Sequence, residues 1–145
     1  MSIFGSLDIS ASALSAERLR MDVTAENLAN AQSTRTADGG PYRRKEVVLQ
    51  QSGGGFAGAL AAARSADGPN GGVRVAGVVE DTAPDRLVYD PGHPDANQQG
   101  YVRMPNVNPV TEMVDLISAS RSYEANVTAM QTAKQMFTKT LDLLR

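Results

Sequence analysis

The chain has 145 residues, no cysteine and a formal net charge of -2 at pH 7. These values exclude disulfides, thiolate nucleophiles and Cys-ligated metals, and they leave no broad basic surface for nucleic acid. Hydrophobic residues make up 41% of the chain, but the aromatic ones include only 3 Phe and no Trp. We therefore expect one small domain with long extensions rather than a single thick core.

The N-terminal segment Met1-Ser-Ile-Phe-Gly5 has no basic n-region, and no long apolar run follows it. We therefore expect no cleaved secretory signal. No apolar run approaches the roughly 20 residues that a membrane helix needs, so direct membrane insertion is not expected either.

A helix is predicted from Ser6 to about Ala31, because this stretch is rich in Ala and Leu and contains no Pro or Gly. Ser6 would be its N-cap. Asn27 and Asn30 are poor helix formers, and would either make specific hydrogen bonds or only cap and fray the helix end. Apolar residues recur every seven positions and predict a seam for another helix; they are Leu7, Leu14, Met21 and Leu28.

Short β-branched runs in the middle of the chain predict strands over residues 46–50, 73–80 and 86–89, which together would form a small antiparallel unit. The stretch from Gly53 to Gly72 is rich in Gly and Ala and predicts a loose connection; it lacks the Lys-Ser or Lys-Thr ending of a phosphate-binding loop. The basic run Arg43-Arg44-Lys45 could contact phosphate or an acidic partner. Without interleaved aromatic residues, a solvated strand end is favoured.

The only histidine, His93, lies in a loop between Asp90 and Asp95. These side chains could be metal ligands, but the prolines of this loop favour an ordered surface turn, and no second cluster completes a site. His93 also has no serine or cysteine nucleophile in a recognisable motif. The sequence thus predicts no catalytic residue, no cofactor site and no metal site.

Residues 109–145 predict one long helix. Asn108 is a good N-cap, Pro109 a favoured first residue, and Glu112 and Asp115 complement the helix dipole. At about 1.5 Å per residue, the helix would reach roughly 55 Å, too long for a compact domain of this size, so it needs a partner. Steps of three and four residues trace a stripe that is apolar at all but two positions; it comprises Met113, Leu116, Ser120, Tyr123, Val127, Met130, Lys134, Phe137, Leu141 and Leu144.

The two terminal helices are expected to pair with each other as an antiparallel coiled coil, with the longer helix overhanging and the middle segment forming a knob at one end. The predicted fold is therefore mainly α with a small β-rich insertion. Small residues flank the C-terminal stripe and suit packing against further helices, which predicts self-association into a larger bundle; they include Ala119, Ser122, Asn126, Ala129 and Ala133.

Residues 16–31, Ala-Glu-Arg-Leu-Arg-Met-Asp-Val-Thr-Ala-Glu-Asn-Leu-Ala-Asn-Ala, resemble the N-terminal signature of the flagellar axial proteins, the rod and hook family. Residues 89–97, 100–108 and 112–126 are similar to the proximal-rod members of that family. These motifs cover most of the chain outside the Gly-rich middle.

The resemblance implies a structural, non-enzymatic subunit of the proximal rod of the bacterial flagellar basal body, the drive shaft that crosses the periplasm and transmits torque. It implies a helical homo-oligomer in contact with other rod proteins and with basal-body membrane ring and adaptor proteins, and export through the flagellar type III exporter. Residues 1–34 and 106–145 would form an inner coiled-coil domain, and residues 35–105 a small β-rich outer domain.

Under this resemblance, torque would pass through many helix contacts, and both terminal helices would supply subunit interface residues. The candidates are Leu14, Met21, Asn27, Leu28, Asn30, Met113, Leu116, Arg121, Tyr123, Glu124, Asn126, Val127, Met130 and Phe137. Outside an assembly, Arg121 and Glu124 would be a surface pair worth a few tenths of a kcal/mol. We also expect the terminal helices to be poorly ordered in the isolated chain and to gain helix on assembly.

Two alternatives remain open. One is another flagellar axial component, such as a different rod protein or a hook-junction protein, although the His93 loop and the Pro105-Asn-Val107 motif disfavour it. The other is an unrelated coiled-coil adaptor or small enzyme, which a catalytic activity lost in His93→Ala would favour.

Overall fold

The computed structural model describes residues 3–37, 39–52 and 71–143. Its elements, in chain order, are helix α1 (Ile3–Ala29), strands β1 (Lys45–Ser52), β2 (Gly72–Glu80), β3 (Arg86–Tyr89) and β4 (Tyr101–Met104), and helix α3 (Pro109–Leu143). Two long terminal helices with small antiparallel sheets between them confirm the predicted fold class. Most of the predicted Gly-rich connection, and Leu144 in the predicted stripe, lie outside the described residues.

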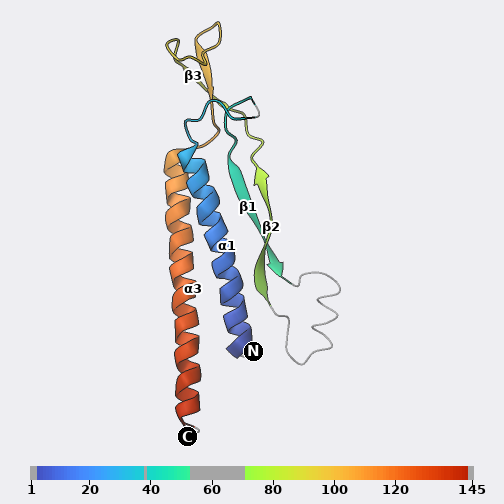
Figure 1. Ribbon diagram of the computed structural model, residues 1–145, viewed down its shortest axis with the longest axis vertical. Helices are drawn as coiled ribbons and strands as arrows, with labels where there is room; N and C mark the ends of the chain where they lie inside the picture. The colour runs from blue at the N-terminus through green and yellow to red at the C-terminus, as the bar shows by residue number, and fades with distance from the viewer. Residues whose placement is uncertain (1–2, 38, 53–70, 144–145) are drawn as a thin grey trace.

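The two helices lie side by side and antiparallel (Figure 1). α1 contacts α3 on one side and strands β1 and β2 on another, whereas α3 contacts no other helix or strand among the described residues. α1 is therefore the middle layer. The prediction of a knob at one end was wrong for β1 and β2, which lie along α1, because an isolated two-stranded sheet needs a surface to cover one face.

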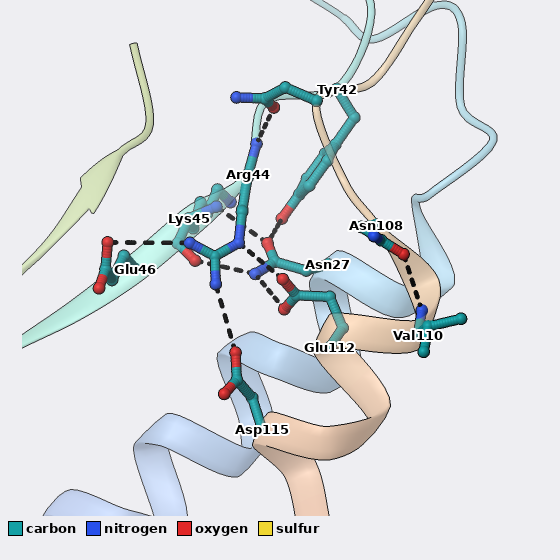
Figure 2. A network of polar contacts seen from close by, with 10 residues as sticks. Asn27, Tyr42, Arg44, Lys45, Glu46, Asn108, Val110, Glu112 and Asp115 are labelled. Atoms are coloured by element: carbon teal, nitrogen blue, oxygen red, sulfur yellow. Dashed lines mark hydrogen bonds and ion pairs between the residues drawn. The ribbon is translucent and has the colours of Figure 1, made fainter. Parts of the chain in front are cut away.

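Side chains near the helix starts explain where the helices begin. Asn108 Oδ1 accepts a hydrogen bond from Val110 N at 3.1 Å, so Asn108 caps α3 as predicted (Figure 2). α1 instead begins at Ile3, and the prediction of Ser6 as its N-cap was wrong. Gly5 weakens a helix by about 1 kcal/mol relative to Ala but does not end it, so the helix continues through this position.

The side of α3 that packs on α1 is only partly the predicted stripe. Leu116, Tyr123 and Met130 of that stripe are half-buried. At three other positions of the stripe, the residue one place earlier in the sequence is the buried one. These residues are Glu112 in place of Met113, Ala119 in place of Ser120, and Ala133 in place of Lys134. The prediction that Ala119 and Ala133 flank the seam was therefore wrong. Small side chains at the centre of the contact let the two helix axes approach closely.

The buried face of α1 is broader than the predicted seven-residue seam. The seam residues Leu7, Leu14, Met21 and Leu28 are only half-buried. The residues of α1 that are buried are Ala16, Val23, Thr24 and Asn27. This difference follows from the second partner: Ser12 Oγ accepts a hydrogen bond from Val73 N at 3.1 Å, which joins β2 to a side of α1 that the seam does not cover.

The three predicted strands exist, but they form two separate sheets. β1 pairs antiparallel with β2, with Lys45 opposite Glu80. β3 pairs antiparallel with β4, a four-residue strand that the sequence analysis missed. Gly100 makes this second pair possible, since its φ of 80° lies in the left-handed region that favours glycine.

The apolar core of the described residues is small. Ala31, Tyr42 and Val107 form a buried cluster where α1 ends and where the segments leading into β1 and α3 meet. Among the described helices, none has the length and apolar character needed to cross a membrane. The fold therefore depends on helix pairing and on polar contacts near this cluster.

Candidate functional site at the junction of the helices and the first strand

A network of polar side chains lies where the end of α1, the start of β1 and the start of α3 meet (Figure 2). We call it the polar junction and define it as Asn27, Tyr42, Arg44, Lys45 and Glu112. Its members come from segments far apart in the sequence. Asn27 and Glu112 are both 1% exposed, so water cannot satisfy their polar atoms.

Asn27 is the centre of the polar junction. Its Nδ2 donates to Lys45 O at 2.8 Å and to Glu112 Oε2 at 3.0 Å. Its Oδ1 accepts from Tyr42 OH and from Lys45 N, both at 2.9 Å. Both donors and both acceptor positions of the amide are used, so one side chain fixes three segments relative to one another.

Asn30 caps the end of α1, which is the simpler of the two roles predicted for Asn27 and Asn30. Its Nδ2 donates to Glu26 O at 3.0 Å within α1, and its Oδ1 accepts from Ser33 Oγ at 3.1 Å in the following turn. These local bonds satisfy the helix end. Specific long-range hydrogen bonding is thus confirmed for Asn27, and capping for Asn30.

Arg44 brings β1 to the start of α3. Its Nε donates to Glu112 Oε1 at 2.6 Å, and other guanidinium nitrogens lie 3.5 Å from Asp115 and 3.8 Å from Glu46 (Figure 2). The hydrogen bond to Glu112 is the largest cause that raises the pKa of Arg44 above its ordinary value. The prediction that the basic run is a solvated strand end was therefore wrong for Arg44, because its acidic partners lie within this chain. Arg43 is exposed, as that prediction expected.

Lys45 and Tyr42 complete the polar junction. Lys45 Nζ donates to Glu26 Oε1 at 2.7 Å and lies 5.6 Å from the centre of the Tyr42 ring. The hydrogen bond to Glu26 raises the pKa of Lys45. The pKa of Tyr42 is also raised, first because burial disfavours the phenolate and then because of the Glu26 charge. The phenol therefore stays protonated and donates to Asn27.

A second polar contact ties the predicted surface turn to the loop after α1. Asp95 accepts hydrogen bonds from Thr34 Oγ1, at 2.8 Å, and from Arg35. The Thr34 bond is the first cause that lowers the pKa of Asp95. His93 Nδ1 accepts a hydrogen bond from Asp95 N at 3.1 Å, so the loop is an ordered turn. In the described parts of the chain, no group of three or more His, Cys, Asp or Glu could hold a metal ion.

The chemistry of the polar junction is that of a rigid connection. A cavity of about 310 Å³ opens beside it, lined by residues of α1, β1 and the start of α3. Arg44, Lys45 and Glu112 on this lining are already engaged in the ion pairs described above. Because the buried charges have partners and the amide of Asn27 is saturated, the arrangement favours fixing the angle between strand and helices over binding a ligand.

The structure separates the predicted interface residues into two groups by burial. One group is buried or half-buried: Leu14, Met21, Asn27, Leu28, Asn30, Leu116, Tyr123, Asn126, Val127 and Met130. The other is exposed: Met113, Arg121, Glu124 and Phe137. No ion pair joins Arg121 to Glu124 within the described residues, so their side chains are not committed to each other.

Tyr42, Arg44 and Glu112 are members of the polar junction that the sequence did not predict. The helix dipole accounts for an acidic residue in the first turn of α3, but that position does not predict the burial of Glu112. The available signal was the asparagine at position 27, because a buried amide near a helix end requires polar partners from elsewhere in the chain.

Two family models match the chain. Residues 7–35 match the model described as "Flagella basal body rod protein". Residues 98–143 match the one described as "Flagellar basal body rod FlgEFG protein C-terminal". The first match covers most of α1, and the second covers β4 and α3, so the two helices that pair in the structure are also the two segments matched.

Curated relatives match along the whole chain. The flagellar basal-body rod protein FlgC of Bacillus subtilis (strain 168) is 51% identical over 148 residues, covering 99% of each chain. FlgC of Yersinia enterocolitica is 50% identical over 143 residues, covering 99% of this chain and 98% of the relative. FlgC of Borreliella burgdorferi is 43% identical over 151 residues, covering 100% and 99%.

Proposed function

The chain belongs to the FlgC family of flagellar basal-body rod proteins, and we propose that it assembles helically into the drive shaft that transmits torque for motility. It is a non-enzymatic, structural subunit of the proximal rod, located in the flagellar basal body, where it assembles with other rod proteins.

The exposed apolar side chains of α3 are the main support for helical assembly. α3 contacts α1 alone among the described elements, and it leaves large apolar side chains exposed along its length. They are Val110, Met113, Val114, Ile117, Met136, Phe137 and Leu141. Exposed apolar surface of this extent on a subunit is typical of a protein–protein interface. Each leucine-sized side chain that a neighbour buries contributes about 1.5–3 kcal/mol.

The polar junction supports the mechanical role. Torque applied to the helices must reach β1 and β2 without bending the chain between them. Asn27 and Arg44 connect β1 to both helices through hydrogen bonds and ion pairs that are largely shielded from water. Such a network transmits force as a rigid joint because its members are held in one geometry.

We assign the interface residues to two tasks. The buried and half-buried group, which includes Leu14, Met21, Leu116 and Tyr123, holds α1 and α3 together within the subunit. The exposed group, Met113, Arg121, Glu124 and Phe137, faces neighbouring subunits. Residues 1–34 and 106–145 would form the inner domain of the rod, and residues 35–105 the outer domain. The specific partners that we propose are copies of this chain, the membrane ring and adaptor proteins, and the flagellar type III exporter.

A deletion strain tests the proposed function. We expect loss of swimming when the gene is removed and recovery when the full chain is returned, with the chain recovered in purified basal bodies. The matched control is a plasmid that carries the gene in the reverse orientation and therefore gives no protein product. A deletion strain that swims normally would remove the drive-shaft role.

The purified chain gives a second test. We expect helix content, followed by circular dichroism, to rise with protein concentration, because the surfaces of α3 outside the α1 contact gain partners only on assembly. A helix content that is complete and independent of concentration, in a chain that sediments as a monomer throughout, would contradict this expectation.

A further inference from the structure

The β3–β4 sheet lies beyond the end of the helix pair at which α3 begins (Figure 1). β3 contacts β4, but among the described elements neither strand contacts a helix or a strand of the first sheet. Val102 of β4 is completely buried, yet it does not belong to the apolar cluster of Ala31, Tyr42 and Val107. We call residues 85–104 the lobe, and the other described residues the body.

The lobe is held together by its own hydrogen bonds. β3 and β4 pair along all four residues of each strand. Beyond the strands, Asp90 N donates to Gly100 O at 2.9 Å, which closes the loop between them. At the other end, Arg103 Nε donates to Asp85 Oδ2 at 3.0 Å. A unit that is bonded in this way can move without losing its internal structure.

The two connections between the lobe and the body are anchored at one residue, Arg44. Its backbone carbonyl accepts a hydrogen bond from Asp81 N at 2.7 Å, before the lobe. Its backbone N donates to Asn106 Oδ1 at 2.8 Å, after the lobe. Asn106 Nδ2 also donates to Ala83 O at 3.4 Å, which joins the two connections to each other. Short connections that meet at one fixed point form a hinge.

A polar contact holds the lobe against the body away from this hinge. In the described part of the chain, the hydrogen bonds and the ion pair of this contact all involve Asp95, which accepts from Thr34 Oγ1 at 2.8 Å and from Arg35. We call these three residues the latch. The Arg35 side chain is 76% exposed, so water can replace its bond at little cost.

The latch is not backed by close packing. A cavity of about 240 Å³ lies beside it, lined by Thr34 and Arg35 from the body and by Asp95, Tyr101 and Arg103 from the lobe. Contacts with few buried apolar groups open at a lower free energy than a packed core does. The latch is therefore weaker than the hydrogen-bonded hinge and the paired strands on either side of it.

We propose that the lobe rotates as one unit about the hinge at Arg44, and that the latch holds it in the position seen in the structure. Opening breaks the bonds of Asp95 with Thr34 and Arg35 and leaves the bonds within the lobe intact. The polar junction stays closed, since none of its side-chain bonds involves the lobe. The lobe can then change its angle while β1 and the helices keep theirs. This motion follows from contacts within one chain and is independent of the helical assembly proposed above.

Distances between paired spin labels test the motion, because the natural chain has no cysteine that would take a label. Gln51→Cys in the body and Gln98→Cys in the lobe are both at exposed positions and report the angle of the lobe. Leu87→Cys with Gln98→Cys lies within the lobe and reports whether the lobe itself stays folded. Both pairs are made in the full-length chain and measured by electron paramagnetic resonance.

The latch is removed from either side, by Asp95→Ala or by Thr34→Val, in both labelled chains. The matched control is Asp90→Ala, which also removes a carboxylate from the loop between β3 and β4. The bond that Asp90 Oδ1 accepts, from Gly92 N at 3.1 Å, lies within the lobe. Loss of Asp90 therefore leaves the latch in place.

We expect one narrow distribution of distances between labels at positions 51 and 98 in the natural background and in Asp90→Ala. Asp95→Ala should broaden it or add a second distance, and Thr34→Val should change it in the same direction. The distance between positions 87 and 98 should stay the same throughout. An unchanged distribution for positions 51 and 98 in Asp95→Ala, or one that is equally broad in the natural background, would overturn the latch. A change between positions 87 and 98 in Asp95→Ala would show local unfolding and overturn rotation of the lobe as a unit.

Discussion

The side-chain amide of Asn27 donates a hydrogen bond to the carboxylate of Glu112 at 3.0 Å, joining α1 to α3 between positions 85 residues apart in the sequence. Both side chains are almost completely buried. The bond lies at the end of the helix pair from which β1 departs, so a single amide holds the helices and the first strand in register (Figure 2). Polar contacts rather than a large apolar core define this end of the molecule.

Replacing Asn27 with Ala should lower the free energy of unfolding by roughly 3 kcal/mol or more. The change removes four hydrogen bonds, so Tyr42 OH and the backbone groups of Lys45 lose their Asn27 partner and Glu112 keeps its bond to Arg44 but loses the one to Asn27. Urea unfolding followed by circular dichroism measures the effect. Asn30→Ala, one residue after the end of α1, is the matched control; its bonds are local, and about 1 kcal/mol is expected. Equal losses in the two variants would show that Asn27 is not a joint between elements.

Glu112→Gln should destabilise the protein by about 1–3 kcal/mol, because it removes the closest of the three carboxylates around the half-buried Arg44. Asp115→Asn, at a longer distance of 3.5 Å and a more exposed position, should cost under about 1 kcal/mol. The double variant Arg44→Met with Glu112→Leu should recover part of the loss, since neither charge is then buried alone. Additive losses in the double variant would argue against a coupled pair.

Ala119→Leu tests the position of the contact between the helices. Ala119 is 0% exposed, so a larger side chain should overpack the contact and cost about 1–3 kcal/mol. Ala129→Leu, at an exposed position on the same helix, should change the free energy of unfolding by less than about 0.5 kcal/mol. If Ala119→Leu left the free energy of unfolding unchanged, the helix contact would instead lie on the stripe through Ser120.

Tyr42 should make stability depend on alkaline pH. Burial raises the pKa of its phenol above 10.0, so the folded state favours the protonated form. Its contribution is fully present below pH 10.0 and is lost as pH rises through the folded-state pKa. At neutral pH, Tyr42→Phe should lower the free energy of unfolding by about 1 kcal/mol through the lost bond to Asn27. The difference in this free energy between the variant and the natural chain should become smaller as the pH rises through the folded-state pKa of Tyr42.

The check is urea unfolding of the natural chain and of Tyr42→Phe at about pH 8 and about pH 11, on either side of an ordinary phenol pKa. Tyr89→Phe is the control, since Tyr89 is exposed. A constant difference between the natural chain and Tyr42→Phe across this range would contradict the assignment.

Gly100→Ala should weaken the β3–β4 sheet. The residue has a φ of 80°, and an added Cβ would lie 2.9 Å from a ring carbon of Tyr89. The two effects together should cost about 1–3 kcal/mol, and amide hydrogen exchange of Val102 would report the local loss. Gly77→Ala in β2 is the control, because nothing lies within 4 Å of its added Cβ. Unchanged protection of Val102 would exclude a conformational need for glycine at position 100.

The sequence alone determined the elements whose signals are local. Periodic apolar residues and the Asn108 cap predicted the long C-terminal helix and its start, and β-branched runs predicted three of the strands. The family also followed from the sequence, because its motifs lie within the two terminal helices. The pairing of those helices was predictable from their two seams.

Only the tertiary structure decided which side chains those helices bury where they pack against each other. The packing selected the Ala119 and Ala133 row beside the larger apolar residues, because small side chains allow close approach of helix axes. It also placed β1 and β2 along α1, which widened the buried face of that helix beyond the row through Leu14. Asn27, Arg44 and Glu112 became one site only because three distant segments meet there. Burial at such a meeting point is a property of the whole fold, and no local pattern encodes it.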